Sequence, residues 1–145
     1  MRAFWSRPRQ DPVKFVYLTG DLSQVAEIKR VAGLAFELAT AASSIDSALN
    51  AAVRTGARVL LTDAELRGFS WREVVAATHV CKPALAVVVV LDSFEGSEWA
   101  DIIRNRAYDV LLRPLRKESF ASTVSGAHLY ATATGGGQMP ANGTD

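Results

Sequence analysis

The sequence has little cysteine, almost no net charge and no long hydrophobic run. Its single cysteine, Cys81, excludes a disulfide within the chain and fits a reducing compartment. The net charge of +1 gives no reason to expect nucleic acid or an anionic membrane as a partner. The longest apolar run, residues 84–91, is much shorter than the roughly twenty residues that cross a bilayer. We therefore expect a soluble, cytoplasmic protein with neither a nucleic-acid nor a membrane partner.

The two ends of the chain lack the patterns of folded structure. The start has no apolar stretch with a cleavage site, so we expect no signal peptide. Three arginines lie near it, but prolines and a tryptophan interrupt them, which favours a flexible arm over residues 1–12 rather than a phosphate-binding patch. Glycine and polar residues predict a disordered tail over residues 132–145, too short for an output domain. This leaves one domain, residues 13–131, which is long enough to bury a core.

Five short apolar segments alternate with five helical patterns between these ends. The expected strands cover residues 13–18, 36–40, 59–62, 85–91 and 110–112. The expected helices begin near Ser23, Ser44, Ser70, Trp99 and Lys117. The apolar face of the second helix carries Ile45, Ala48, Leu49, Ala52 and Val53, and that of the last helix carries Phe120, Val124, Ala127 and Leu129. The segment 85–91 is apolar without alternation, so it needs cover on both faces and belongs near the centre of a parallel sheet. Strand–helix alternation with short loops predicts an α/β fold, with one parallel sheet between two layers of helices.

Charged side chains follow four of these strands. Because chemistry in such sheets gathers at the carboxyl ends of the strands, we expect Asp21, Asp63 and Asp92 to lie near one edge, with Arg113 as a nearby cation. Carboxylates gathered in this way suit a hard divalent ion. The alternative for Asp21 and Asp92 is that they are solvated or cap helices. Asp63 directly follows an apolar strand and needs a partner, so we predict an ion pair between Asp63 and Arg113.

Other catalytic patterns are missing from the sequence. It contains no GxGxxG after the first strand, no GxxxxGK[ST] and no GxSxG, which argues against dinucleotide, P-loop and serine-hydrolase chemistry. His79 and His128 have no ligand-like neighbour four residues along, and Cys81 has no general base nearby. A small enzyme using the carboxylate cluster is an alternative. However, no nucleophile–base pair can be assembled, and we expect no enzymatic activity.

Two segments carry a resemblance to response-regulator receiver domains of two-component signalling. VLLTDAELRGFSW, residues 59–71, resembles the strand–aspartate–loop segment of that family, and AYDVLLRPL, residues 107–115, resembles its GADDYLxKPF segment. Ala48 and Leu49 match the paired Ala-Leu of its second helix. The resemblance covers residues 13–131 with nearly gap-free spacing. It implies a flavodoxin-like, doubly wound (βα)5 fold with five parallel strands in the order 2-1-3-4-5.

The resemblance carries over only part of the family's active site. Asp63 matches the aspartate that accepts phosphate from a histidine kinase, and Arg113 takes the place of the lysine that contacts the phosphoryl group. The acidic pair that holds Mg²⁺ falls on Thr19 and Gly20, with Asp21 one place late. Mg²⁺ is therefore implied only if Asp63 is a working phosphoacceptor, with Asp63 and Asp21 as its ligands.

The switch elements of the family are also changed. The hydroxyl residue that ends the fourth strand falls on Leu91, and Asp92 and Ser93 complete this switch loop. Leu91 cannot donate a hydrogen bond to a phosphoryl group, while Ser93 offers a hydroxyl two positions later. The aromatic switch residue falls on Val110. The proline and glycine of the loop after the phosphoacceptor fall on Arg67 and Trp71.

Two functions follow from the resemblance. One is a single-domain receiver protein in a phosphorelay, with Asp63 as the phosphoacceptor and impaired Mg²⁺-dependent chemistry. The alternative is a pseudo-receiver, a protein-interaction module that acts without phosphorylation. Its partner would be a histidine kinase or a downstream signalling protein, and a homodimer is a further option. The family docks through the face made by its fourth and fifth helices and last strand, here Trp99, Ile103, Arg104, Arg106 and Tyr108. Trp99 either anchors a partner there or packs inward.

Overall fold

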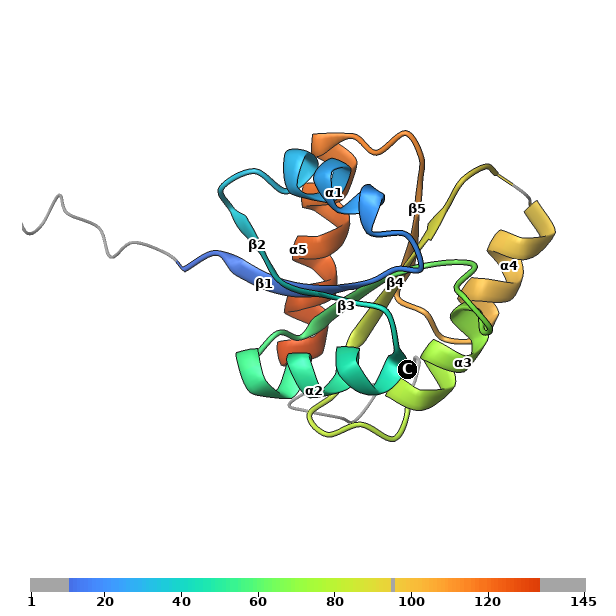
Figure 1. Ribbon diagram of the computed structural model, residues 1–145, viewed down its shortest axis with the longest axis horizontal. Coiled ribbons are helices and arrows are strands. Elements are labelled where there is room, and N and C mark those ends of the chain that lie inside the picture. Colours follow the sequence, from blue (N-terminus) through green and yellow to red (C-terminus); the bar gives the residue numbers. More distant parts are fainter. Residues whose placement is uncertain (1–10, 95, 134–145) are drawn as a thin grey trace, which may run out of the picture.

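The computed structural model describes residues 11–94 and 96–133 (Figure 1). The strands are β1 Val13–Leu18, β2 Phe36–Ala42, β3 Val59–Asp63, β4 Ala86–Leu91 and β5 Asp109–Leu112. The helices are α1 Val25–Ala32, α2 Ile45–Thr55, α3 Trp71–Thr78, α4 Gly96–Arg104 and α5 Lys117–Ala133, with a short 3-10 turn, η1, at Leu22–Gln24. The predicted arm and tail lie almost entirely outside the described residues. Within these residues, no helix combines the length and hydropathy needed to cross a membrane.

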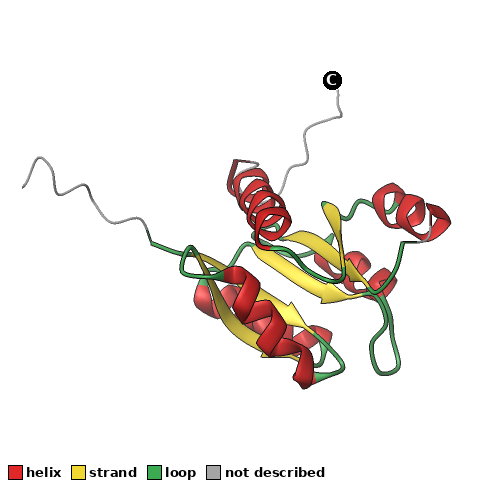
Figure 2. Cartoon of the chain, turned by 90° about the horizontal axis from the view of Figure 1, so that it is seen from above, coloured by secondary structure: helices red, strands yellow, loops and turns green. Residues whose placement is uncertain are grey.

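The strands form one parallel sheet in the order β2-β1-β3-β4-β5, which confirms the predicted fold. Helices cover both faces, as Figures 1 and 2 show. α1 and α5 pack against one face, and α2, α3 and α4 against the other. Every residue of β4 is buried, and this strand pairs with β3 and β5. The uninterrupted apolar run therefore predicted an interior strand correctly.

Each face of the sheet has its own core. On the α1–α5 side, Phe120 makes edge-to-face contacts with Phe15 and Phe36, with ring centroids 5.5 and 5.6 Å apart. On the other side, Trp71 at the start of α3 is only 2% exposed. These two cores hold the carboxyl ends of β1, β3 and β4 side by side, which fixes the geometry of the loops that follow them.

Helix starts and stops follow the local sequence in most places. The Ser44 side chain accepts a hydrogen bond from a backbone N–H at the start of α2, and Gly56 ends this helix with a φ of 79°. Ser70 begins α3 through a reciprocal capping box with Glu73. The first helix differs from the prediction, because Asp21 caps η1 and Ser23 lies within that turn.

Two residues predicted to face inward are instead exposed. Val53 on α2 and Leu129 on α5 are each 66% exposed. The inward positions are taken by Ala51 and Ala131, which are fully or almost fully buried. Alanines let a helix pack close to a sheet, so the small residues rather than the larger aliphatic ones mark the buried stripe of these two helices.

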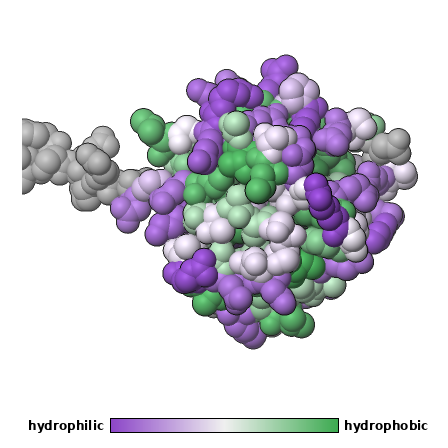
Figure 3. All heavy atoms as spheres, in the orientation of Figure 1, coloured by the Kyte–Doolittle hydropathy of each residue, from purple (hydrophilic) through white to green (hydrophobic). Residues whose placement is uncertain are grey.

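β2 forms one edge of the sheet and is less deeply buried than β4. Its middle residues, 38–41, are half-buried, and its pairing with β1 shifts register between Phe15 and Val16. Figure 3 shows apolar and weakly polar side chains across the middle of the face seen in Figure 1, with hydrophilic side chains around them. This edge is therefore partly open to solvent.

Candidate functional site

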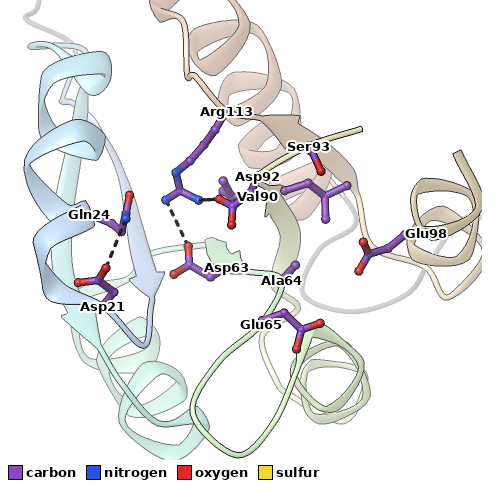
Figure 4. A pocket seen from close by; sticks show the side chains of 11 residues that line it. Asp21, Gln24, Asp63, Ala64, Glu65, Val90, Asp92, Ser93, Glu98 and Arg113 are labelled. Atoms are coloured by element: carbon purple, nitrogen blue, oxygen red, sulfur yellow. Dashed lines mark hydrogen bonds and ion pairs between the residues drawn. The ribbon is translucent and has the colours of Figure 1, made fainter. Parts of the chain in front are cut away.

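A cleft of about 290 Å³ lies at the carboxyl ends of the strands (Figure 4). It is lined by Asp21, Gln24, Asp63, Ala64, Glu65, Val90, Leu91, Asp92, Ser93, Glu98 and Arg113. The structure thus brings the four predicted charged residues to one site. Five of the lining side chains are acidic, and Arg113 is the single basic one.

Asp63 is the last residue of β3, and its side chain is only 13% exposed. Its Oδ1 accepts a hydrogen bond of 2.5 Å from the Tyr17 hydroxyl, and its Oδ2 accepts one of 2.6 Å from the Thr19 hydroxyl. Distances this short are typical of hydroxyls bound to an ionised carboxylate. Both oxygens of the predicted phosphoacceptor are therefore engaged by donors from β1 and the residue that follows it.

Tyr17 was not predicted as a site residue. It lies in β1 and is fully buried, and its side chain packs in the α1–α5 core. Burial raises the pKa of its hydroxyl, and the bond to Asp63 raises this pKa further. A tyrosine inside an otherwise apolar strand was the available signal, because a buried tyrosine hydroxyl normally finds a hydrogen-bond partner.

Arg113 follows β5 and contacts several oxygens of the site. Its Nη2 lies 3.5 Å from Oδ1 of Asp63, so the predicted ion pair is present. This contact with Asp63 is the longest that Arg113 makes at the site. Its Nε lies 3.0 Å from Glu27 Oε1 and its Nη1 lies 3.2 Å from Asp92 Oδ1. Its Nη2 lies 3.0 Å from the Tyr17 hydroxyl. Burial disfavours the charged guanidinium, but Tyr17, Glu27 and Asp63 outweigh burial and raise its pKa. The cation is thus shared among three carboxylates.

Glu27 on α1 was not predicted as a site residue. Besides its bond to Arg113, its Oε2 accepts a hydrogen bond of 3.3 Å from the backbone N–H of Leu115. It therefore ties α1 to the segment between β5 and α5. Glu27 lies in the first turn of α1, where a negative charge is favourable, and this position alone gives no sign of its contact with Arg113.

Asp21 turns away from the middle of the cleft towards its own turn. Its carboxylate accepts hydrogen bonds from the Ser23 hydroxyl and N–H, at 2.7 and 3.0 Å, and these bonds lower its pKa. Figure 4 shows it directed towards Gln24. Asp21 therefore caps the turn η1, as in the alternative given above for this residue. This geometry does not support the predicted role of Asp21 as a metal ligand.

The position of the missing acidic pair is covered by a basic side chain. Arg67 donates a hydrogen bond of 3.0 Å from Nε to the carbonyl of Gly20. A Cβ added to Gly20 would lie 3.3 Å from Cγ of Arg67. Among the described residues, no group of three or more histidine, cysteine, aspartate or glutamate side chains could hold a metal ion. The residues at this site therefore do not fit the Mg²⁺ that the resemblance implies.

The loop after β4 offers no hydroxyl where the family has one. Leu91 is buried with the α2–α3 core, and its carbonyl accepts the N–H of Arg113 at 2.9 Å. The side chain of Asp92 is 88% exposed and contacts Arg113. Ser93 is exposed and lines the cleft. Leu91 and Asp92 of the switch loop are therefore both in contact with Arg113.

The predicted docking residues divide into two groups. Trp99 and Ile103 are 42% and 37% exposed on α4, so Trp99 faces outward rather than packing fully inward. Arg104 is exposed and pairs with Asp101 at 2.6 Å. Arg106 and Tyr108 instead lie between α4 and β5, where they line a second pocket together with Ile103.

No family model and no curated protein sequence matches this chain. Solved structures do match it. The signal receiver domain of a modulated diguanylate cyclase from Desulfovibrio desulfuricans G20 aligns with a TM-score of 0.70 and 14% identity over 85% of this chain and 98% of that one. The REC domain of the response regulator AraT from Geobacillus stearothermophilus gives a TM-score of 0.67 and 18% identity, covering 83% and 95% of the two chains.

A third neighbour is a CheY-like response regulator receiver domain protein from Methanospirillum hungatei JF-1, with a TM-score of 0.67 and 13% identity over 86% of this chain and 99% of that one. The sheet order and the helices on its two faces define a flavodoxin-like α/β protein. Within that class, these neighbours show that the chain has the fold of a response-regulator receiver domain.

Proposed function

We propose that this protein is a receiver-type signalling module that acts through protein contacts without phosphoryl transfer at Asp63. The observation that carries the proposal is the double hydrogen bonding of the Asp63 carboxylate, by Tyr17 at 2.5 Å and by Thr19 at 2.6 Å. A phosphoacceptor must present one oxygen as a nucleophile in line with the incoming phosphorus. Here both oxygens are engaged by hydroxyls that a phosphoryl group would have to displace.

The electrostatics of the cleft support the same proposal. Phosphoryl transfer depends chiefly on positioning and on neutralising the charge of the transferred group, and a metal ion normally supplies much of both. The cleft has five acidic side chains, which would repel a phosphoryl donor, and its one cation is shared with Glu27, Asp63 and Asp92. Leu91 adds no hydroxyl. The arrangement therefore stabilises the unmodified carboxylate.

The outward face of α4 supports a protein partner. Trp99 and Ile103 expose apolar surface on one side of this helix, and aromatic side chains of this kind commonly anchor protein interfaces. We propose a cytoplasmic, non-enzymatic module whose partner is a histidine kinase, a downstream signalling protein or a second copy of the chain. Substitution of Trp99 by alanine would weaken binding to that partner.

A second candidate function is a phosphorelay receiver with slow chemistry at Asp63. It is favoured by the position of Asp63, which ends β3, lines the cleft and keeps 13% of its side chain exposed. In this function Tyr17 and Thr19 would release the carboxylate before it reacts. The second candidate predicts a phosphorylated product, whereas the first does not.

Incubation with acetyl phosphate and Mg²⁺, followed by intact-protein mass spectrometry, separates the two functions. We expect no gain of one phosphoryl mass in the wild-type protein. Asp63→Asn is the direct control, and Asp92→Asn is matched to it because Asp92 lines the same cleft. A mass gain that persists in the Asp92 variant and disappears in the Asp63 variant would establish the phosphoacceptor function instead.

A further inference from the structure

A second and larger pocket, of about 790 Å³, lies at the opposite end of the sheet. It is formed by the first residues of β4, the residues before β5, and the carboxyl-terminal ends of α3, α4 and α5. Its lining consists of Thr78, His79, Cys81, Ala84, Leu85, Ala86, Val87, Ile103, Arg106, Ala107, Tyr108, Tyr130 and Ala131. Small-molecule sites typically enclose about 300–1,000 Å³ and combine apolar walls with a few polar groups. This pocket has that size and composition.

The charge of the lining is one-sided. It contains no aspartate or glutamate, and Arg106 is its single lysine or arginine. The ion pairs found within residues 11–94 and 96–133 do not include Arg106. A cation beside apolar walls and away from carboxylates is electrostatically suited to an anion from outside the chain.

Arg106 also has an unfavourable backbone conformation. Its φ is +76°, and it is the one non-glycine residue with positive φ in the part of the chain that the structure describes. Its N–H bonds to the carbonyl of Ile103, and the N–H of Ala107 bonds to that of Ile102, so α4 ends in a turn that favours glycine. Non-glycine residues in strained backbone conformations cluster at functional sites, which suggests a role for the Arg106 side chain. Arg106 is one of the residues that line the pocket.

Two tyrosines, with their rings tilted against each other, form an aromatic wall in the same pocket as this cation. The rings of Tyr108 and Tyr130 lie 5.5 Å apart at 45°. A Cβ at Gly126 would come within 2.5 Å of the Tyr108 hydroxyl, so α5 holds this ring closely through a residue without a side chain. Arg106 lines the same pocket as both rings, and its charge opposes the rise that burial causes in the pKa of Tyr130. The wall and the cation therefore form parts of one site.

We propose that this pocket binds a small aromatic carboxylate, with its ring against Tyr108 and Tyr130 and its carboxylate paired with Arg106. An aromatic ring fits the apolar and aromatic lining, and a single negative charge matches the single cation. The site shares no residue with the Asp63 cleft. Binding here is thus independent of whether Asp63 accepts phosphate.

Cys81 makes the pocket directly measurable. It is the single cysteine of the sequence and lines the pocket, so its alkylation reports on access to the site. Burial raises the pKa of its thiol, so iodoacetamide labelling is followed by mass spectrometry at mildly alkaline pH. We expect 2-naphthoate to slow the labelling saturably and the neutral 2-naphthamide to bind about tenfold more weakly, the effect of losing one charge-assisted hydrogen bond. Equal protection by both compounds, or protection by neither, would overturn the proposal.

The variant Arg106→Gly tests the assigned cation. Glycine suits the positive φ at this position, so the variant is expected to fold. It should weaken protection by 2-naphthoate about tenfold. The matched control is Arg104→Gln, which removes a nearby exposed arginine outside the lining and should leave the protection unchanged. Equal effects of the two variants would contradict the role of Arg106. Protection of Cys81 without ligand that rises with protein concentration would mean that a second copy fills the pocket, and would also overturn the proposal.

Discussion

The two ends of the sheet have opposite electrostatic characters. At the carboxyl end, five acidic side chains line the cleft, and the one cation there contacts three carboxylates of the chain itself. At the amino end, the lining contains no carboxylate, and the one cation has no ion pair among the described residues. The end at which receiver folds carry out chemistry has satisfied its polar groups internally, whereas the opposite end keeps a charge available for a ligand.

Hydroxyl groups account for much of this difference. Thr19 stands where the resemblance places an acidic residue, and Tyr17 brings a second hydroxyl from within β1. A carboxylate at position 19 would repel Asp63 unless a cation lay between them, whereas the hydroxyl of threonine stabilises Asp63 without one. The fold is thus kept while the requirement for an ion at this end is removed.

The largest expected effect comes from restoring the acidic pair at the carboxyl end of the sheet. In the variant Thr19→Asp/Gly20→Asp/Arg67→Ala, the loss of Arg67 makes room for the new Cβ at position 20, which would otherwise lie 3.3 Å from its Cγ. Mg²⁺ at a hundred times its Kd should then raise the free energy of unfolding by about 2.7 kcal/mol. Thermal unfolding with and without Mg²⁺ measures this effect, and adding Asp63→Asn should reduce it. Equal stabilisation of the wild-type protein by Mg²⁺ would show that the wild-type site already binds the ion.

Removal of the central carboxylate should destabilise the protein. Asp63→Ala leaves the Thr19 hydroxyl without its carboxylate acceptor and the Tyr17 hydroxyl with fewer partners, and we expect it to lower the free energy of unfolding by about 1–3 kcal/mol. Asp92→Ala, which removes an exposed carboxylate from the same cleft, should change this free energy by less than about 0.5 kcal/mol. Urea unfolding of both variants makes the comparison. If Asp63→Ala were as stable as the wild type, the hydroxyls would not be holding Asp63.

Alkaline pH should destabilise the protein through the ionisation of Tyr17. The pKa of Tyr17 lies above its ordinary value of 10.0 in the folded state, so its contribution to stability is complete below about pH 10 and is lost as the pH rises towards the folded pKa. The free energy of unfolding should therefore fall by about 1.4 kcal/mol per pH unit above roughly pH 10 because of this residue. Urea unfolding between pH 9 and 11 should show a smaller fall in Tyr17→Phe. An identical fall in the two proteins would contradict the assigned contact.

The smallest expected effect concerns Arg106, at the amino end of the sheet. Arg106→Gly should raise the free energy of unfolding by about 1 kcal/mol, because glycine adopts the positive φ of this position without strain. Arg104→Gln, two residues earlier in an exposed ion pair, should leave the value nearly unchanged. Urea unfolding measures both variants. Destabilisation by Arg106→Gly would mean that the guanidinium already has a strong partner within the chain.

The fold could be predicted because its signals are local. Strand–helix alternation, the serine caps of α2 and α3 and the uninterrupted apolar run of β4 all depend on neighbouring residues. The predictions for Val53 and Leu129 were wrong because the helical spacing alone does not show how closely a helix packs. Contacts between the helices and the sheet decide that the alanines, rather than these larger residues, face inward.

The site was predictable only in part for the same reason. The position of Asp63 and its pairing with Arg113 followed from the buried strand that precedes Asp63. The contacts of Tyr17 with Asp63 and of Glu27 with Arg113 join residues 46 and 86 positions apart, and no periodicity reports them. Tertiary packing decides these contacts, and they determine whether the aspartate is free to react.

The most direct test of the closed cleft is a Mg²⁺ titration of the ¹⁵N-labelled wild-type protein, followed by the amide resonances of Thr19, Asp63 and Asp92. The hydrogen bonds from Tyr17 and Thr19 and the missing acidic pair predict no saturable shift of these resonances beyond the effect of ionic strength. Saturable shifts at these three residues that Asp63→Asn abolishes would contradict the account.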